Sequence, residues 1–194
     1  MRQILIADCH DSFVFNVVEL LRAMDRCVVE IVSVEQAGAI DLSSYAGIVL
    51  SPGPSTPTRT EGLLPLVARC YTTHSVLGIC LGHQALGAFF GAEPVRLEHP
   101  RHGYGEQLID VAADELLFRA YHGTKVARYH SWIVDEATLP QTLQITARAA
   151  SDHTIMALRH KDLPLRSVQF HPESFLSEEG FAMLAAWVTS LPDK

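Results

Sequence analysis

Ser75-Val-Leu-Gly-Ile-Cys-Leu-Gly-His-Gln84 is the stretch that decides the predicted fold and its chemistry. Residues 75–79 form a short apolar run rich in branched side chains, which is typical of a buried strand, and residues 81–90 have the length and apolar spacing of a helix. Cys80 stands at the corner between them, with one glycine on either side in a G-x-C-x-G pattern. In the G-x-S-x-G elbow, small flanking residues let a nucleophile occupy a tight strand-to-helix turn. The stretch therefore predicts an elbow that carries a thiol.

The position of Cys80 has two chemical consequences. A thiol at a helix N-terminus lies at the positive end of the helix dipole, which favours the thiolate. The backbone N–H of Leu81 would point toward an oxyanion formed on an attacked carbonyl. A buried structural cysteine is the alternative interpretation, and the two flanking glycines favour the nucleophile over it.

Composition limits the kinds of protein that the chain can be. Its 194 residues, 48% hydrophobic and 19% charged, suit one α/β domain spanning residues 1–194. A net charge of −7 without a basic cluster argues against nucleic acid or an anionic membrane as a partner. The four cysteines lack metal-binding or redox spacing, the N-terminus is typical of a strand rather than a secretion signal, and no apolar run reaches transmembrane length. We therefore expect a cytoplasmic protein with reduced thiols.

Strands and helices alternate over the first half of the chain. Predicted strands cover residues 3–7, 27–34, 47–50 and 75–79, and predicted helices cover residues 13–24, 61–71 and 81–90. Asp11 or Ser12 is available as the N-cap of the first helix, and Pro65 either bends the second or marks its true start. Such alternation indicates a parallel sheet, in which sites gather at the carboxyl ends of the strands. The loops at residues 8–12 and 51–55 should therefore share one rim with Cys80.

After Gly91 the pattern changes to short strand-like runs. They cover residues 92–97, 106–111, 125–130, 143–149, 155–160 and 165–170. Turn signals separate them at His102-Gly103, His122-Gly123, Leu139-Pro140 and Ser151-Asp152. We expect an antiparallel or mixed section here.

A closing helix is predicted over about residues 178–191. Ser177 is its expected N-cap, and Glu178 and Glu179 are expected in its first turn. Its buried stripe is predicted to consist of Phe181, Leu184, Ala185 and Val188.

A cysteine nucleophile needs a base, and the base needs a group to hold it. His171 leaves the end of a branched strand and is followed by Pro172, which fixes one backbone torsion, and by Glu173. The carboxylate can fold back to the imidazole, so Cys80, His171 and Glu173 are the predicted triad. A surface His-Pro-Glu turn is the alternative. His83, three residues after the cysteine, is expected to pack or cap rather than to act as the base.

Four motifs in the chain resemble one known family. GICLGHQ (78–84), SPGP (51–54), RYHS (128–131) and QFHPES (169–174) are similar to motifs of the class I, triad-type glutamine amidotransferases. The resemblance is strongest to the free-standing glutaminase subunits of anthranilate synthase and aminodeoxychorismate synthase, and it covers nearly the whole chain. It implies a flavodoxin-like three-layer fold with a central, mostly parallel sheet, flanking helices and a small antiparallel section in the C-terminal half.

The resemblance also implies roles for individual residues. Cys80 would attack the side-chain amide of glutamine, His171 would move the proton to the leaving ammonia, and Glu173 would orient the ring. Water would then hydrolyse the glutamyl thioester. Gly53 and Leu81 would supply the N–H groups of the oxyanion hole. The residues implied in glutamine binding are Gly53, Pro54, Ser55, Gln84, Ser131 and Trp132; the last three could otherwise be a helix-surface residue and a strand-end turn.

Three positions depart from the family pattern. Ser55 replaces the last glycine of a PGPG motif, Cys9 stands where asparagine is common, and Tyr104 replaces the lysine of a His-Gly-Lys segment. Cys9 lacks an elbow and is predicted not to be the nucleophile. Because the regions around Cys9 and Tyr104 lie where relatives meet their synthase subunit, we interpret these two changes as an altered partner surface.

The chain holds nothing that would receive ammonia, since it has no phosphate-binding loop, nucleotide fingerprint or second domain. The resemblance therefore implies a heteromeric complex with a larger chorismate-binding synthase subunit, component I. It implies no cofactor and no metal in this chain, and magnesium only in the partner. Anthranilate synthase component II is the first interpretation, and aminodeoxychorismate synthase component II, or a subunit serving both, is the alternative.

Two further interpretations lie outside this family. A cysteine peptidase or γ-glutamyl hydrolase would use the same triad with an open cleft for a chain-like substrate. A non-catalytic binding module could keep the fold, although the intact triad argues against it.

Overall fold

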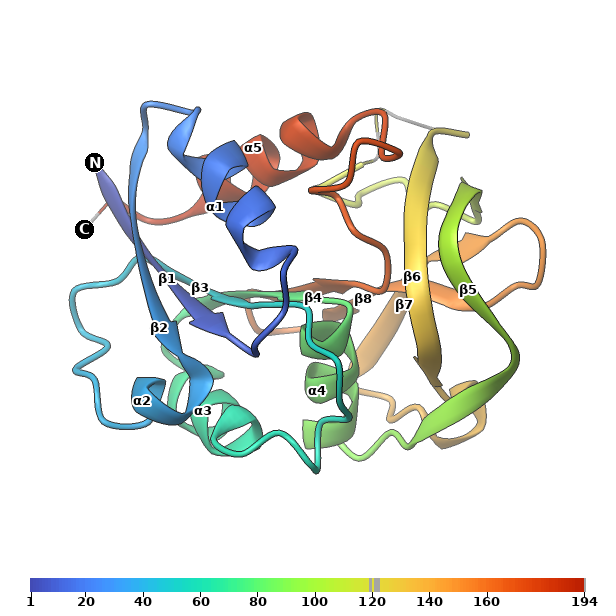
Figure 1. The fold of residues 1–194 in the computed structure, drawn as a ribbon, viewed down its shortest axis with the longest axis horizontal. Helices are drawn as coiled ribbons and strands as arrows, with labels where there is room; N and C mark the ends of the chain where they lie inside the picture. Colours follow the sequence, from blue (N-terminus) through green and yellow to red (C-terminus); the bar gives the residue numbers. More distant parts are fainter. Residues whose placement is uncertain (119, 121–122, 194) are drawn as a thin grey trace.

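The computed structural model describes residues 1–118, 120 and 123–193. Its strands are β1 (Arg2–Asp8), β2 (Cys27–Ser33), β3 (Gly47–Leu50), β4 (Ser75–Ile79), β5 (Pro94–Ile109), β6 (Lys125–Val134), β7 (Leu143–Ala149), β8 (Ile155–His160) and β9 (Leu165–Val168). Its α-helices are α1 (Val14–Arg22), α2 (Val34–Ala37), α3 (Leu63–Cys70), α4 (Leu81–Phe89) and α5 (Gly180–Ser190). Within the described residues, nine strands form one mixed sheet in the order β2-β1-β3-β4-β9-β8-β7-β5-β6 (Figure 1).

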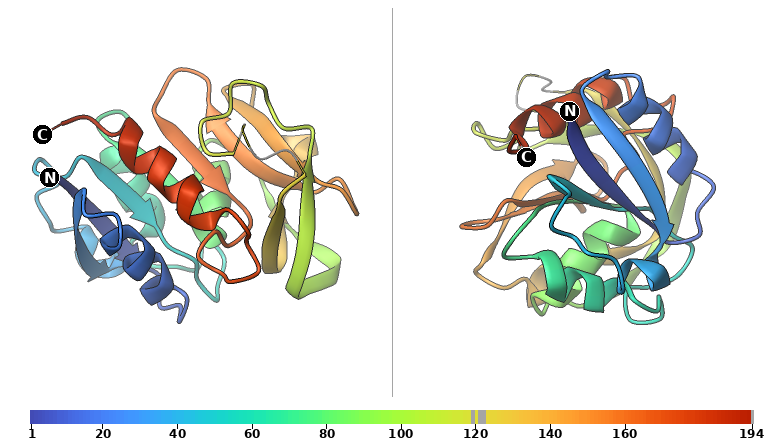
Figure 2. Two further views of the ribbon diagram at one scale, coloured as in Figure 1. Left: turned by 90° about the horizontal axis from the view of Figure 1, so that it is seen from above. Right: turned by 90° about the vertical axis from the view of Figure 1, so that its left-hand side faces the viewer.

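The parallel half of the sheet runs from β2 to β9 and is covered on both faces. Ile4 and Ile6 of β1 pack in one apolar cluster with α1 and α5, whereas Leu5 and Ala7 pack in another with α3 and α4. All four side chains are fully buried, as expected for a parallel strand between two helical layers. Figure 2 shows α1 and α5 side by side on one face, so the predicted α/β fold with flanking helices is confirmed.

The antiparallel half extends further than the short runs in the sequence indicated. Residues 92–97 and 106–111, predicted as two strands, belong largely to the single strand β5, which pairs with β6. The predicted turn at His102-Gly103 is wrong because these residues lie within β5, where the register shifts and Gly103 has a φ of 70°. A bulge therefore accommodates them without reversing the chain. The turn at His122-Gly123 falls partly outside the described residues, since His122 is not among them.

Residue types and hydrogen bonds near the first turn determine where α1 and α3 begin. Phe13 is the N-cap of α1 and makes no side-chain capping bond, so the predicted cap at Asp11 or Ser12 is wrong. Asp11 Oδ1 instead accepts a hydrogen bond from the Phe13 N–H (2.8 Å), which closes a turn before the helix. Pro65 is the third residue of α3, in the first turn where a missing N–H is tolerated, and the helix begins at Leu63 rather than at the predicted residue 61. Helix α2, which was not predicted, is capped by its preceding serine.

Helix α5 begins later than predicted because its expected cap has other partners. Ser177 Oγ accepts a hydrogen bond from Ala127 N–H (3.0 Å) and donates one to the His171 carbonyl (2.6 Å). Glu179 is the N-cap instead, so Glu178 and Glu179 precede the first turn.

The buried stripe of α5 also differs in part from the prediction. Phe181 is 47% exposed and Ala185 is half-buried, whereas Met183 and Trp187 join Leu184 and Val188 in the core. The buried stripe therefore follows Met183, Leu184, Trp187 and Val188, and Phe181 lies outside it. None of the described helices is long and apolar enough to span a bilayer.

The register of the parallel strands brings four chain segments to one edge of the sheet. Ala7 pairs with Leu50, Leu50 with Gly78, and Ile79 with Val168. The segments that follow β1, β3, β4 and β9 therefore start side by side, as the sequence predicted for the first three.

Candidate active site

Cys80 occupies a sharp corner between β4 and α4. Its backbone has φ 51° and ψ −98°, a positive φ that side-chain-bearing residues rarely adopt. Its N–H donates to the Val168 carbonyl (2.8 Å), and its own carbonyl accepts from the Gln84 N–H (3.1 Å) as the helix begins. The thiol is 6% exposed. The elbow predicted from the sequence is therefore present.

Two glycines allow the strand and the helix to meet at this corner. A Cβ atom on Gly78 would lie 2.5 Å from the Gly82 carbonyl oxygen and 2.9 Å from the His83 nitrogen. A Cβ atom on Gly82 would overlap the Leu50 carbonyl of the neighbouring strand. The G-x-C-x-G spacing is thus required because backbone packs directly on backbone on both sides of the cysteine.

His171 and Glu173 form a buried pair beside the elbow. His171 Nδ1 lies 2.7 Å from Glu173 Oε1, and the two residues are 2% and 6% exposed. The His171 N–H donates to the Ala127 carbonyl (2.9 Å), which fixes the backbone of the base against β6. Since the carboxylate accepts the Nδ1 proton, Nε2 is left as the basic nitrogen, and it has no hydrogen-bond partner among the described residues.

The electrostatics of His171 suit a general base. Burial disfavours its charged form, but the nearby Cys80 charge and the contact with Glu173 together raise the pKa of His171 well above its ordinary value. Phe13 and Tyr129 pack on the ring, with centroids 5.1 and 5.3 Å away. The arrangement allows the imidazole to take a proton from the thiol and hold it as an imidazolium.

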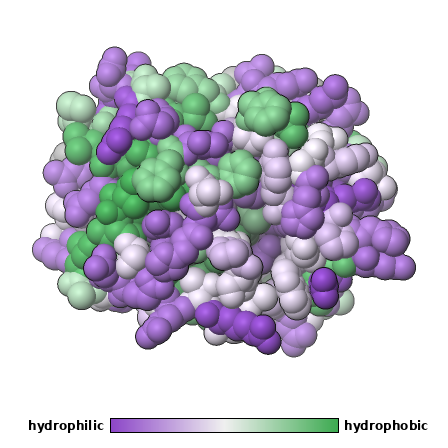
Figure 3. Space-filling view, in the orientation of Figure 1, coloured by the Kyte–Doolittle hydropathy of each residue, from purple (hydrophilic) through white to green (hydrophobic). Residues whose placement is uncertain are grey.

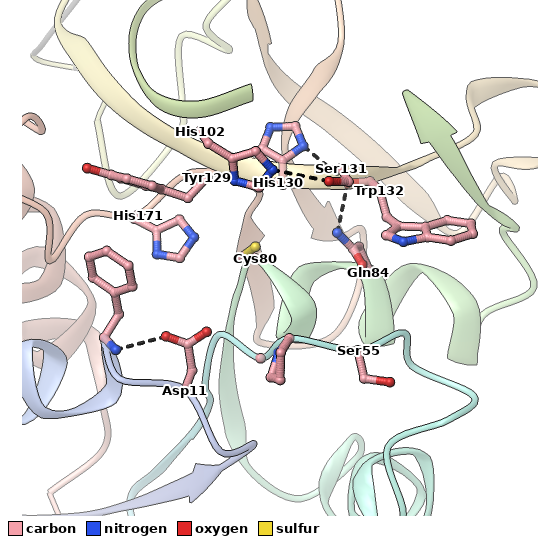
Figure 4. Close-up of a pocket in the computed structure, with 13 residues that line it drawn as sticks. Asp11, Ser55, Cys80, Gln84, His102, Tyr129, His130, Ser131, Trp132 and His171 are labelled. Atoms are coloured by element: carbon pink, nitrogen blue, oxygen red, sulfur yellow. Dashed lines mark hydrogen bonds between the residues drawn. The ribbon is translucent and has the colours of Figure 1, made fainter. Parts of the chain in front are cut away.

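A cavity of about 400 Å³ opens over the thiol (Figure 4). The residues that line it are Asp11, Phe13, Gly53, Pro54, Ser55, Cys80, Gln84, His102, Tyr129, His130, Ser131, Trp132 and His171. It contains every residue predicted to bind glutamine, together with the thiol and the imidazole. Glu173 lies behind the imidazole and does not line the cavity, as expected for a residue that orients the base.

Gly53 lies against the first residue of α4. A Cβ atom at this position would overlap Leu81 Cδ2 and lie 2.9 Å from Cys9 Cβ, so only glycine fits. The backbone of the loop after β3 therefore reaches the N-terminus of the elbow helix. This closeness is what an oxyanion hole made of the Gly53 and Leu81 N–H groups requires.

The Ser131–Trp132 backbone is held by a buried polar network behind the cavity. Arg128 is fully buried, pairs with Glu106 (3.0 Å) and donates from Nε to His130 Nε2 (3.1 Å). Because a guanidinium only donates, His130 carries its proton on Nδ1, which lies 3.1 Å from the Trp132 carbonyl. Burial, followed by the Arg128 charge, lowers the pKa of His130 to about 3. The ring is therefore neutral, and its tautomer is fixed.

Several lining residues received no role from the sequence. Tyr129 and His130 belong to the RYHS motif, which drew attention only to its serine and the tryptophan that follows. His102 reaches the cavity from the β5 bulge, with Nε2 3.2 Å from Ser131 Oγ. Sequence spacing gives no signal for the bulge, so the approach of His102 could not be predicted.

Cys9 differs sharply from Cys80 although both lie near the same edge of the sheet. Its N–H donates to Ser51 Oγ (2.8 Å), and its side chain is buried. Burial raises the pKa of Cys9 to about 12. Its thiolate is therefore scarce at neutral pH, in line with the prediction that it is not the nucleophile.

His83 packs beneath the elbow, as predicted. The side chain is fully buried, and Nδ1 lies 2.9 Å from Ser167 Oγ. Burial lowers the pKa of His83 to about 3. The folded chain therefore excludes a proton that the unfolded chain binds below about pH 6.5.

This difference predicts a loss of stability in acid. Between pH 7 and pH 5, the unfolded state gains a proton at His83 that the folded state cannot bind, which costs about 2 kcal/mol of unfolding free energy. His171, whose pKa is raised, changes the free energy of unfolding in the opposite direction, but it is present in both chains, so its effect cancels in the comparison below. Urea denaturation of His83→Asn at the two pH values should show a loss smaller by about 2 kcal/mol than that of the wild type. Equal losses would contradict the assignment.

The described residues contain no group of three or more His, Cys, Asp or Glu side chains arranged to hold a metal ion. The cavity instead combines an elbow thiol, an imidazole held by a carboxylate, and backbone N–H groups beside the thiol. These features define a cysteine-dependent hydrolase or acyltransferase of the triad type.

Comparison with known proteins makes the class specific. The family model of glutamine amidotransferase class-I matches residues 5–191, and the chain belongs to this family. It is thus an enzyme with glutaminase activity.

Relatives and solved structures agree with this assignment. The chain is 40% identical to anthranilate synthase component 2 of Azospirillum brasilense, over 93% of this chain and 92% of the relative. It is 35% identical to aminodeoxychorismate synthase component 2 of Klebsiella aerogenes, over 94% and 97%. A glutamine amidotransferase structure from Thermotoga maritima superposes with a TM-score of 0.73 over 97% of this chain and 81% of that one; at 17% identity it shows the fold alone.

Proposed function

We propose that this chain is the glutaminase subunit of a two-chain synthase. It hydrolyses L-glutamine at Cys80 and passes the ammonia to a larger chorismate-binding subunit, component I. We place the complex in the cytoplasm, in line with four buried, unpaired thiols, and we assign any magnesium to the partner. The relatives named component 2 of two synthases support this proposal.

The chemistry follows from the triad geometry. The Cys80 sulfur attacks the amide carbon of glutamine while His171 Nε2 takes the thiol proton. The oxyanion is stabilised by the Gly53 and Leu81 N–H groups, and His171 returns the proton to the leaving ammonia. Water then attacks the thioester with His171 again as the base, and the products are glutamate and the free thiol. The observation that carries this proposal is the orientation of His171, whose Nδ1 is held by Glu173 and whose Nε2 is free.

The partner is proposed to dock around the mouth of the cavity. Phe175, two residues after the triad glutamate, is 90% exposed, and Phe15 near the start of α1 is 61% exposed. Figure 3 shows apolar side chains exposed on this face over the N-terminal half of α1 and over the turn before α5. Exposed aromatic residues of this kind are common in protein–protein interfaces. Tyr104, which departs from the family pattern, is also exposed. The Arg101 guanidinium carbon lies over the Tyr104 ring, 5.1 Å from the centroid of that ring.

Reconstitution with the native synthase subunit tests both parts of the proposal. Glutamate release should be slow from the chain alone and should rise when the partner and chorismate are added. Phe175→Ser should weaken assembly about tenfold or more, without changing the slow basal rate, because it removes an aromatic side chain that the proposed interface would bury. Val28→Ser is the matched control, since Val28 is also exposed but lies at the opposite end of β2 from the cavity.

The outcomes separate the competing interpretations. Glutaminase activity on free glutamine, with none on small peptides or polyglutamates, supports the amidotransferase over a peptidase or γ-glutamyl hydrolase. Failure of a glutamine-like electrophile to label Cys80 would instead favour a non-catalytic module. The product formed from chorismate distinguishes the two pathways: anthranilate supports component II of anthranilate synthase, and aminodeoxychorismate supports the folate-pathway alternative. Equal assembly of the Phe175→Ser and wild-type chains would contradict the docking surface.

A further inference from the structure

Gln169 is a fully buried polar residue for which the catalytic cycle described above has no use. It lies between the end of β9 and the triad histidine, two residues before His171. Its side chain makes two contacts: Nε2 donates to Cys80 Sγ (3.6 Å), and Oε1 accepts from Gln84 Nε2 (3.3 Å). Gln169 therefore joins a residue of the substrate cavity directly to the sulfur of the nucleophile.

The Trp132 carbonyl, at one end of this series of hydrogen bonds, determines which group donates in each of them. The Trp132 carbonyl can only accept, so Gln84 must turn its NH₂ group toward it, at 2.8 Å. The second N–H of the same group then points at Gln169, which must present its oxygen to Gln84. The NH₂ group of Gln169 is consequently left to face Cys80. An amide flip at either residue would place two donors or two acceptors against each other.

We propose that Gln169 is a positioning residue that donates a hydrogen bond to the Cys80 sulfur and couples the thiolate to Gln84 in the glutamine cavity. An N–H donor favours a thiolate over a thiol, because a charged acceptor forms the stronger hydrogen bond. The same contact restricts the rotation of the sulfur at a corner that is already tightly constrained. Gln84 Oε1 makes no hydrogen bond in the described part of the chain, so glutamine can use it without disturbing the rest of the series. The assignment rests on the proposed function only in the role that it gives to Gln84.

The test is alkylation of Cys80 by iodoacetamide as a function of pH, measured on the full chain by mass spectrometry. Gln169→Met keeps the length of the side chain and removes the donor. The pH of half-maximal alkylation should rise by about one unit, and kcat for glutamine should fall about tenfold or more, with a smaller change in KM. Gln169→Glu places a carboxylate beside the sulfur and should shift the profile further in the same direction.

Ser167→Ala is the matched control. Ser167 lies two residues earlier on β9, is equally buried and bonds to His83, but does not touch the sulfur. Its alkylation profile should match that of the wild type. An unchanged profile in both Gln169 variants would overturn the proposal, and so would an equal shift in Ser167→Ala, because general loosening of the strand would then explain the effect. Alkylation does not require glutamine, so failure of the proposed function would appear separately, as absence of glutaminase activity in a wild-type chain with a normal profile.

Discussion

Replacing Cys80 with serine is expected to lower kcat for glutamine hydrolysis by roughly 10⁴-fold or more. The hydroxyl has nearly the same shape, but it is far less acidic than a thiol, so the helix N-terminus and His171 cannot ionise it. Release of glutamate should be measured in the reconstituted complex with saturating chorismate. Synthesis from added ammonium salt should remain, because the substitution affects only the source of ammonia.

Cys70→Ala provides the matched control for this prediction. Cys70 is also a buried cysteine, but it lies in α3 and does not line the cavity, and burial raises its pKa to about 12. It should retain the wild-type kcat. If Cys80→Ser kept more than a tenth of the wild-type rate, another group would have to make the first attack.

Replacing Glu173 with glutamine is expected to lower kcat by roughly 10³–10⁴-fold with little change in KM. The carboxylate accepts the Nδ1 proton of His171 at 2.7 Å and stabilises the imidazolium that forms during the reaction. An amide can instead donate to Nδ1, which would move the ring proton to Nε2 and leave the thiol without a base. The volume of the side chain is almost unchanged, so the fold should remain intact.

Glu178→Gln is the corresponding control. Glu178 belongs to the same chain segment but is exposed, and its carboxylate accepts a hydrogen bond from the Lys125 N–H (3.3 Å). Its kcat should be close to that of the wild type. A loss of less than threefold in Glu173→Gln would show that the imidazole keeps its tautomer without the carboxylate.

The parts of the fold that follow local pattern were predictable from the sequence. The strand at Ser75–Ile79 was predicted to the residue because a short apolar run gives way there to the G-x-C-x-G corner and to the apolar spacing of a helix. The parallel half of the sheet was predictable from the alternation of strands and helices. Because the carboxyl ends of parallel strands meet at one edge of a sheet, the position of the loops at residues 8–12 and 51–55 near Cys80 was predictable as well. The residues expected to bind glutamine could be chosen only through motif resemblance, since Gly53 and Ser131 come together through the tertiary fold.

What the sequence could not reveal depends on contacts between distant segments. Ser177 has the ideal residue type for a helix cap, yet its hydroxyl hydrogen-bonds both to His171 and to Ala127, which lies 50 residues earlier in the sequence. His102 and Gly103 have the composition of a turn but lie in a bulge, because β6 pairs with the chain on both sides of them. Gln169 was visible within a motif, and only its placement against the sulfur suggests a role.

The backbone conformation at Cys80 serves catalysis but lowers the stability of the fold. A residue held at φ 51° stores on the order of 1–3 kcal/mol of strain, and glycine is the amino acid best suited to such a conformation. A chain that no longer had to hydrolyse glutamine would become more thermostable if glycine replaced Cys80. The active enzyme cannot accept this substitution, because the sulfur is its nucleophile.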